Sequence, residues 1–358
     1  MKKDKDHFRG CLLGGAIGDA LGWPVEFMRI NEIRTKYGEN GITDLVVGTS
    51  GKAEITDDTQ MTLFTAEGIL LAEAERRYRG NCDVAISVYR AYLRWLHTQG
   101  SYHQVLENIG LIDGLYEGIY NSGWLYSVKE LHSKRAPGNT CLSALFSGKR
   151  GTIDDPINDS KGCGGVMRVA PAGLFYPKDE AFEKAAEFAA ITHGHPSGYL
   201  SAGALAYIIA SIIEGEDIEK AVKGAVEKLQ RYEGSEECLR GLGMAFELSK
   251  SDMPDVDAIS KLGQGWVGEE ALAIATYCAL KYRDDFRKAL IAAVNHDGDS
   301  DSTGAITGNI MGAYLGLSHI PVEWVDKVEL KDVIMEIADD LLVGYRDDED
   351  WQRRYGRL

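Results

Sequence analysis

The sequence predicts an all-α protein, and three observations lead to that fold class. Apolar side chains recur at the helical spacing i, i+3, i+4, i+7, as at Tyr89, Tyr92, Leu93 and Leu96. The strict alternation of a β-strand is nearly absent, and residues 42–47 are the one weak candidate. Apolar residues form 44% of the 358-residue chain and charged residues 26%, which is typical of a globular protein with a substantial core.

The chain has eight prolines and no Pro/Ser-rich linker. We therefore expect one compact domain over residues 1–358, although its length alone would allow two domains.

The first apolar segment carries Gly14, Gly18 and Gly22 at four-residue spacing. On a helix these glycines fall near one face, and each costs about 1 kcal/mol relative to alanine. We interpret them as a surface for close helix packing. The helix should end at Pro24, with Glu26 in the loop that follows.

The sequence also predicts the structure of three further segments. The most apolar stretch, residues 199–213, is shorter than the ~20 residues of a membrane span, so a buried core helix is expected. A second amphipathic pattern covers residues 218–229. Residues 110–161 are rich in Gly, Ser, Asn and Asp, which predicts long loops broken by short helices. Such loops often carry binding residues, and this region is the first candidate for target choice.

The overall charge and the cysteines restrict the function. A formal net charge of −16 argues against a free nucleic-acid surface, because phosphate backbones require a basic footprint. A phosphate-bearing substrate stays possible, since cations and backbone N–H groups also hold phosphate. The six cysteines form no CxxC pair and no signal-peptide pattern opens the chain. We expect a cytoplasmic protein that binds no membrane, with an oligomeric state that the sequence leaves open.

The first acidic motif is Thr56-Asp57-Asp58-Thr59, directly before an apolar helical run. Hydroxyls and carboxylates are common at helix N-termini because they satisfy free N–H groups. One such residue would be enough for capping. Two adjacent carboxylates between two threonines exceed that need, so a metal role stands beside the capping role.

The second acidic motif runs from Gly298 to Gly304, and it again precedes a helical pattern, residues 305–315. Asp299, Asp301 and the hydroxyl of Ser302 supply the oxygen ligands that hard cations such as Mg²⁺ prefer. An EF-hand is excluded, because the twelfth position of such a loop would be Ile310 instead of glutamate.

If the fold brings the two motifs together, four aspartates share one pocket. Asp57, Asp58, Asp299 and Asp301 would then repel one another strongly unless cations neutralise them. This repulsion favours two metal ions over one. A pair of ions can polarise a substrate oxygen and activate a water molecule.

Two other motifs are weaker. Gly162, Cys163, Gly164 and Gly165 precede an apolar stretch that begins with Val166 and Met167. Glycines let a backbone approach a ligand and direct N–H groups at phosphate, but a simple turn explains them too. The segment THGHPSG, residues 192–198, carries two histidines whose spacing is not that of a helical metal site. Of the two, His193 is the better candidate for a pocket residue.

Taken together, the motifs resemble the ADP-ribosylglycohydrolases. The resemblance covers residues 8–317 and rests on five segments in order: GCLLGGAIGDALGWPVEF, TDDTQMTLFTAEGIL, GCGGVMRVAPAGLF, THGHPSGYLSAG and NHDGDSDSTGAITGNIMGAYLG. It implies a compact orthogonal helical bundle with a centre of two Mg²⁺ (or Mn²⁺) ions. By motif position, the metal ligands would be Thr56, Asp57, Asp58, Asp299, Asp301 and Ser302.

The same resemblance implies a substrate and residue roles. The glycine segment 162–167 and His193 match the family segments that hold ADP-ribose, and Glu26 matches the glutamate after the first helix. The metals would bind the ribose hydroxyls and a water, while the bond at the ribose C1″ is cleaved. Glu26 or Asp58 would take or supply a proton, and the assignment between them stays open.

We expect the enzyme to remove ADP-ribose from a modified protein, with arginine as the first candidate linkage. The TDDT and GDSDST motifs resemble those of the ADP-ribosylarginine hydrolases more than those of the ADP-ribosylserine hydrolases. Serine-linked and other ADP-ribose substrates stay open. A non-catalytic relation to lens crystallins is less favoured, because every ligand position holds an oxygen donor. A two-metal phosphohydrolase, which would release phosphate instead of ADP-ribose, is the third alternative.

Overall fold

The computed structural model describes residues 1–100 and 123–356, without the side chain of Arg79. Within these residues it contains α-helices and short 3-10 helices but no strand, which confirms the all-α prediction. The helices of the first half are α1 (Lys5–Gly22), α2 (Ile30–Tyr37), α3 (Asp57–Arg79), α4 (Val84–Thr98), α7 (Asn139–Phe146), α8 (Ala170–Phe175) and α9 (Lys178–Ala190). Those of the second half are α10 (Pro196–Glu214), α11 (Ile218–Leu229), α12 (Glu236–Ser249), α13 (Asp255–Leu262), α14 (Gly268–Lys281), α15 (Phe286–Val294), α16 (Ser300–Leu315), α17 (Val322–Lys327), α18 (Lys331–Val343) and α19 (Glu349–Tyr355).

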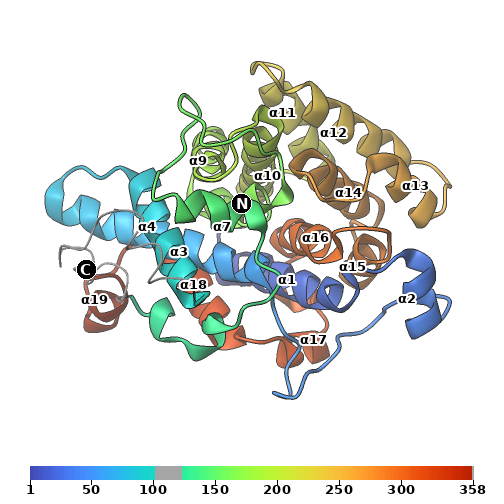
Figure 1. Ribbon diagram of the computed structural model, residues 1–358, viewed down its shortest axis with the longest axis horizontal. Coiled ribbons are helices and arrows are strands. Elements are labelled where there is room, and N and C mark those ends of the chain that lie inside the picture. The colour runs from blue at the N-terminus through green and yellow to red at the C-terminus, as the bar shows by residue number, and fades with distance from the viewer. Residues whose placement is uncertain (101–122, 357–358) are drawn as a thin grey trace.

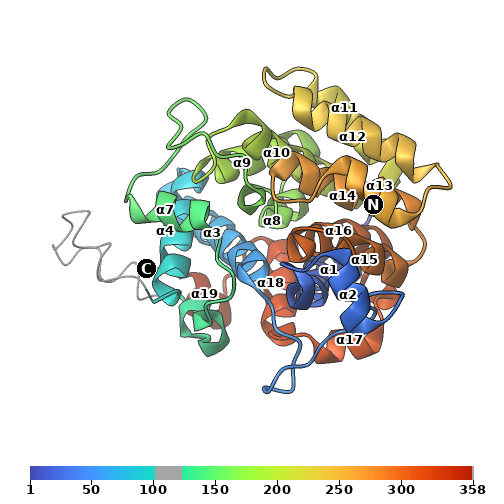
Figure 2. The same ribbon diagram turned by 45° about the vertical axis from the view of Figure 1, so that its right-hand side comes forward.

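Helices α1 and α16 lie side by side near the middle of the molecule, although one begins the chain and the other lies near its end (Figure 1, Figure 2). They run antiparallel and meet through glycines. A Cβ placed on Gly18 would lie 2.0 Å from the carbonyl oxygen of Gly304, and one on Gly308 would lie 1.9 Å from that of Gly14. The glycine face expected of the first helix is therefore a packing surface, and α16 supplies matching glycines.

Replacing Gly308 by alanine should destabilise the fold. The new methyl group has no space at the helix contact, and overpacking of this kind costs about 1–3 kcal/mol. Gly243 offers a matched control, because it lies in α12, is exposed and has no atom within 4 Å of an added Cβ. Gly243→Ala should stabilise by up to about 1 kcal/mol through helix propensity. Urea unfolding compares the two; equal stability of both variants would contradict the close packing.

The apolar segment predicted as a core helix is α10, which is longer than its most apolar part. Its 19 residues are long and apolar enough to cross a membrane by length and composition, but 89% of the most apolar window is buried inside the protein. It packs against α8, α9, α11 and α14. The prediction of a buried core helix is confirmed.

The weak strand prediction for residues 42–47 is wrong. The segment is irregular, and it pairs with a side chain instead of another strand. The N–H of Ile42 donates to Oδ1 of Asn295 at 2.8 Å, and Nδ2 of Asn295 donates to the carbonyl oxygen of Ile42 at 2.8 Å. A buried amide side chain thus satisfies the backbone that a partner strand would otherwise satisfy.

Residues 123–161 follow the prediction of loops broken by short helices, namely η2 (Leu125–Ser127), η3 (Lys129–His132) and α7. Residues 110–122 of the same predicted region lie outside the described residues.

Candidate metal centre

The TDDT segment forms the N-terminus of α3. Thr56 is the cap, and its hydroxyl oxygen accepts a hydrogen bond from the N–H of Asp58 at 3.3 Å. Asp57 and Asp58 occupy the first turn and are both buried. Because a threonine already caps the helix, capping does not account for the two carboxylates.

The GDSDS segment forms the N-terminus of α16. Asp299 is the cap, with Oδ1 accepting from the N–H of Ser302 at 3.3 Å. Asp301 and Ser302 lie in the first turn, and all three side chains are buried. The two acidic motifs therefore have the same local structure, a helix start that holds more oxygen atoms than the helix requires.

Glu26 joins the two motifs. It follows the short helix η1 (Trp23–Val25) at the end of α1, and one oxygen each of Glu26, Asp299 and Asp301 lies within 4.8 Å of the others. Asp57 is close enough to raise the pKa of Glu26, and Asp58 is close enough to raise that of Asp301. The structure thus brings together carboxylates from three distant parts of the chain.

The electrostatics of this cluster favour a bound cation. Burial first, and then Asp299, Asp57 and Asp19, raise the pKa of Glu26 to about 9. Burial also raises the pKa of Asp57, Asp58 and Asp301 well above its usual range, with the neighbouring carboxylates adding to the effect. Oε2 of Glu26 and Oδ2 of Asp58 are buried without a hydrogen-bond partner. Buried carboxylate oxygens without partners are costly, so the donor set fits hard divalent cations.

Without metal, the protein should lose stability as pH rises from about 5 to 9. The folded state keeps a proton on Glu26, whose pKa is raised to about 9, whereas the unfolded chain releases it near its ordinary pKa of about 4.3. Folding then takes up protons, so the free energy of unfolding falls with rising pH. Melting curves in chelator should show this slope, and Glu26→Gln should reduce it. A melting temperature of the metal-free protein that rises from pH 5 to pH 9 would contradict the repulsion among the buried carboxylates.

Asp19 is a buried acid of the site that the sequence analysis did not single out. It lies in the last turn of α1, and its carboxylate accepts from the N–H groups of Thr56 and Thr59, at 3.0 and 3.2 Å to Oδ2, and from the hydroxyl of Thr59. Burial raises its pKa to about 6, although these hydrogen bonds oppose the shift. Asp19 therefore fixes the start of α3 on α1. Its signal in the sequence is an acid inside an apolar, glycine-rich helix.

The glycine segment borders the acidic cluster through Cys163. The thiol of Cys163 donates to Oδ2 of Asp299 at 2.7 Å, and the hydroxyl of Ser302 lies 3.6 Å from the same sulfur. Burial and Asp299 raise the pKa of this thiol well above its usual range. Gly164 and Gly165 complete the short helix η4 (Cys163–Gly165), which turns the chain toward α8.

Most N–H groups of this segment are already used within the protein. Gly162 donates to the hydroxyl of Ser160, and Cys163 donates to the carbonyl oxygen of Trp266. Val166 and Met167 both donate to the carbonyl oxygen of Cys163. Within the described residues, the N–H groups of Gly164 and Gly165 are those left for a ligand.

His193 lies beneath the glycine segment. It is fully buried, and Nδ1 is 2.8 Å from the hydroxyl of Thr192, while Nε2 has no partner. A Cβ on Gly164 would lie 3.1 Å from Cε1 of His193, so the ring packs directly against the glycine backbone. Burial, and then Arg168, lower the pKa of His193 to about 3, which keeps the ring neutral. His195 has a different place, since its Nδ1 caps α10 by accepting from the N–H of Ser197.

A loop from residue 133 to 138 forms another wall of the centre. The N–H of Gly138 donates to Oδ2 of Asp57 at 3.1 Å, and the N–H of Asp57 donates to the carbonyl oxygen of Arg135 at 3.3 Å. The guanidinium of Arg135 is held in turn by Glu329 and by the carbonyl oxygen of Ile55. These contacts could not be predicted from the sequence, because they join segments that only the fold brings together.

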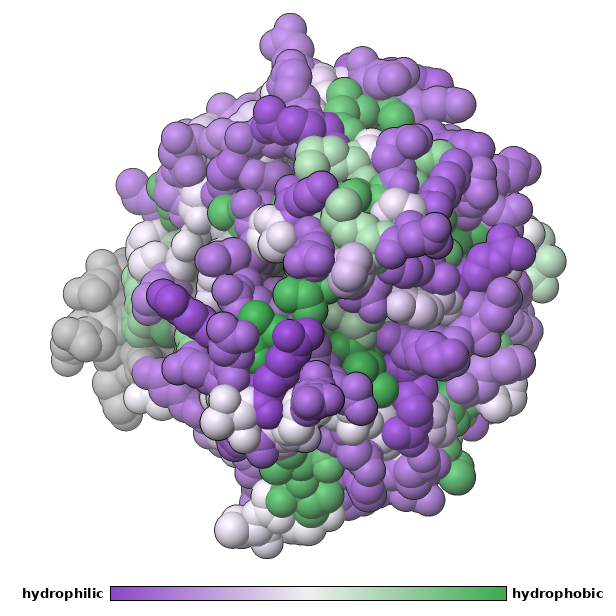
Figure 3. All heavy atoms as spheres, turned by 90° about the vertical axis from the view of Figure 1, so that its right-hand side faces the viewer, coloured by the Kyte–Doolittle hydropathy of each residue, from purple (hydrophilic) through white to green (hydrophobic). Residues whose placement is uncertain are grey.

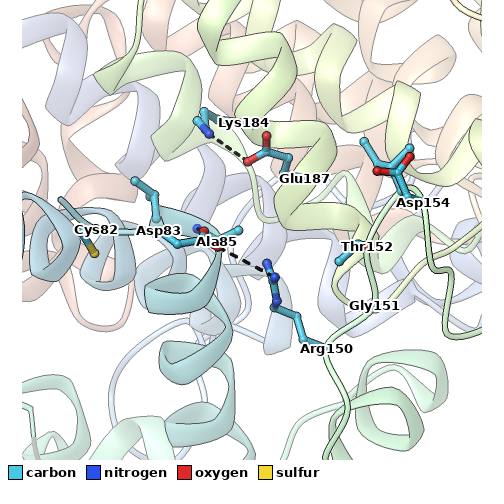
Figure 4. A pocket seen from close by; sticks show the side chains of 11 residues that line it. Cys82, Asp83, Ala85, Arg150, Gly151, Thr152, Asp154, Lys184 and Glu187 are labelled. Carbon is cyan, nitrogen blue, oxygen red and sulfur yellow. Dashed lines mark hydrogen bonds and ion pairs between the residues drawn. The ribbon is translucent and has the colours of Figure 1, made fainter.

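A surface pocket of about 490 Å³ lies elsewhere, between the start of α4, the loop around residue 151 and α9 (Figure 4). Its cations face its anions: Arg150 lies 3.8 Å from Asp83, and Lys184 lies 2.9 Å from Glu187. These four charges are thus paired, and none of the acidic-cluster residues lines the pocket.

These features define an all-helical protein with a buried acidic centre beside a glycine turn. A family model described as ADP-ribosylglycohydrolase matches residues 1–350. The chain belongs to the ADP-ribosylglycohydrolase family, whose members hydrolyse ADP-ribose from modified proteins.

Individual relatives agree with this assignment. The chain is 28% identical to an ADP-ribosyl-[dinitrogen reductase] glycohydrolase of Rhodospirillum rubrum, over 91% of each chain. It is 27% identical to ADP-ribosylarginine hydrolase Tri1 of Serratia proteamaculans, over 94% of this chain and 79% of the relative. A solved structure named as an ADP-ribosylglycohydrolase-related protein complex has the same fold, with a TM-score of 0.62 and 22% identity, over 96% of this chain and 99% of that one.

Proposed function

We propose that this protein is a metal-dependent hydrolase that removes ADP-ribose from modified protein side chains, and from ADP-ribosylarginine in particular. The observation that carries the proposal is the convergence of Glu26 with the acidic starts of α3 and α16 in one buried cluster. Neither a helix cap nor a salt bridge explains so many buried carboxylates. A centre of two divalent cations that binds the sugar would explain them.

The residues present fit two Mg²⁺ or Mn²⁺ ions. The ligands would be Thr56, Asp57, Asp58, Asp299, Asp301 and Ser302, which supply oxygen atoms only. Within the described residues, Oδ2 of Asp58 is buried without a hydrogen-bond partner, which supports this set. When bound, the ions would orient the ribose hydroxyls and lower the pKa of water, which is the chemistry that such centres supply.

Two carboxyl groups remain candidates for moving the proton. Glu26 and Asp58 each hold a buried oxygen without a partner, so each has an oxygen atom available to substrate or water. Glu26 is not one of the six proposed ligands, and one of its oxygens lies within 4.8 Å of oxygens of Asp299 and Asp301, so it can exchange a proton with a group bound at the centre. In the proposed mechanism Glu26 therefore donates a proton to the leaving group, and Asp58 binds metal.

The diphosphate of the substrate would lie against the glycine segment. Both glycines, Gly164 and Gly165, are buried, and their N–H groups donate to no other group of the described residues, so they would be the donors to a diphosphate that reaches this turn. Backbone N–H groups bind phosphate without a basic surface, which is consistent with the formal net charge of −16. His193 would support this backbone from below, as its ring packs on Gly164.

Release of intact ADP-ribose from an arginine-linked peptide tests the proposal. The protein is incubated with Mg²⁺ and the substrate, and the products are identified by mass. We expect free ADP-ribose and unmodified arginine. Release of phosphate or AMP would indicate a phosphohydrolase, release only from serine-linked peptide would reassign the linkage, and no release from any linkage would favour a non-catalytic relative.

A further inference from the structure

Two aromatic rings stack on the surface beside the acidic cluster. Phe27 directly follows Glu26 and is 72% exposed, while Trp266 is 38% exposed. Their ring centroids lie 5.7 Å apart with an interplanar angle of 19°. A single exposed apolar side chain is common on protein surfaces, but here two exposed aromatic rings from separate loops stack on each other beside a buried acidic cluster.

The loop that carries Trp266 is fixed to the centre. The N–H of Asp299 donates to the carbonyl oxygen of Gln264 at 2.8 Å, and the N–H of Cys163 donates to that of Trp266 at 3.1 Å. The N–H of Gln264 itself donates to Oε2 of Glu270 at 2.9 Å. Trp266 is therefore held on a loop that touches both the acidic cluster and the glycine segment.

The segment that carries Phe27 is fixed on the opposite side. The N–H of Met28 donates to the carbonyl oxygen of Val25 at 2.9 Å, and the N–H of Ile30 donates to Oδ1 of Asp297 at 2.6 Å. Phe27 thus lies between the buried Glu26 and the start of α2. The two rings approach from separate loops and meet at the edge of the centre.

The surroundings of the rings are acidic and largely polar. Glu26 directly precedes Phe27 in the sequence, and the N–H of Asp299 is bonded to Gln264, two residues before Trp266. Asp297 is exposed on the adjoining loop. Figure 3 shows the face that carries α2 and α13: it is mostly hydrophilic, with apolar side chains gathered near its middle. An aromatic face attracts a flat cation, and the exposed carboxylate of Asp297 adds to this attraction when metal ions neutralise the buried cluster.

We propose that the stacked rings of Phe27 and Trp266 form an aromatic clamp, in which the guanidinium group of ADP-ribosylarginine lies on an exposed ring face and not between the two rings. This inference rests on the proposed function and names the recognition element of its leaving group. A guanidinium is planar and cationic, and it stacks on aromatic faces. It is bonded directly to the ribose, so a group beside Glu26 reaches it, whereas the adenine is separated from the ribose by the diphosphate and a second sugar.

The clamp is tested by separating recognition of arginine from recognition of ADP-ribose. Phe27→Leu and Trp266→Leu keep an apolar side chain but remove the aromatic face. We expect each to raise KM for the arginine-linked peptide by about tenfold, a typical effect of one desolvated cation–π contact. The Kd of free ADP-ribose, measured by calorimetry, should stay within about twofold. Phe27→Tyr should restore the wild-type KM.

Two controls keep the outcome clear. Val322→Ala removes another exposed apolar side chain, 70% exposed, and should change neither KM nor Kd. Melting temperatures identify any variant that fails to fold. An unchanged KM in both leucine variants would overturn the clamp and leave the proposed function standing. A parallel rise in the Kd of ADP-ribose would also overturn it and assign the rings to the adenine. A wild type without arginine-linked turnover would overturn both proposals.

Discussion

Asp57→Ala and Asp301→Ala should each lower the Mg²⁺-dependent release of ADP-ribose by more than about 100-fold. Loss of a residue that merely supports a metal ligand costs 10–100-fold, and these two are placed as ligands themselves. Each comes from a different acidic motif, so both motifs are tested. Asp284→Ala is the control, because it removes an aspartate that is 82% exposed.

The same variants should be more stable than the wild type in the absence of metal. Each removes one charge from a buried cluster whose members raise one another's pKa. A loss of activity together with a higher metal-free melting temperature excludes unfolding as the cause. Variants that stay fully active, or that lose activity only because they unfold, would contradict their assignment as ligands.

Asp19→Ala should destabilise the protein by about 3 kcal/mol or more. The change leaves the N–H groups of Thr56 and Thr59 and the Thr59 hydroxyl buried without an acceptor, and each unsatisfied group costs about 1–3 kcal/mol. The start of α3 would shift with them, so activity should fall as well.

Asp19→Asn is the matched variant for this test. Its amide oxygen can occupy the position of Oδ2, which accepts all three of these hydrogen bonds, so the fold should be kept. The free energies of unfolding in urea of the two variants separate the loss of the hydrogen-bond acceptor from the loss of the negative charge. Equal stability of the alanine and asparagine variants would contradict the positioning role of Asp19.

The helices were predictable because their patterns are local. The spacing of Tyr89 and Tyr92 defines one face of α4, and the apolar residues of 218–229 define the buried face of α11. The glycine face of α1 was predicted too. That α16 supplies Gly304 and Gly308 opposite to it could not be predicted, since the pairing of two helices distant in sequence depends on the whole fold. The strand expected at 42–47 does not form; at its first residue, Ile42, the side chain of Asn295, far along the chain, bonds both the N–H and the carbonyl oxygen.

The site was predictable to the extent that it lies in motifs. TDDT and GDSDS exceed the needs of a helix cap. The structure groups Asp299 and Asp301 with Glu26, and it places Asp57 and Asp58 close enough to raise the pKa of Glu26 and Asp301. Asp19, Arg135 and the Phe27–Trp266 pair act through contacts between separate segments, and a single sequence does not show these. The glycine segment shows the same limit. Its pattern suggested backbone N–H groups directed at phosphate, but the N–H groups of Cys163, Val166 and Met167 donate within the protein, which the sequence could not show.

The stoichiometry of Mn²⁺ binding tests the central proposal, a two-metal centre built by the two acidic motifs, most directly. Electron paramagnetic resonance of the metal-free protein titrated with Mn²⁺ measures the number of bound ions and their magnetic coupling. We predict two ions per chain with a coupled spectrum, and loss of the coupling in Asp57→Ala and Asp301→Ala. Binding of no ion, or an uncoupled spectrum that both variants leave unchanged, would contradict the account.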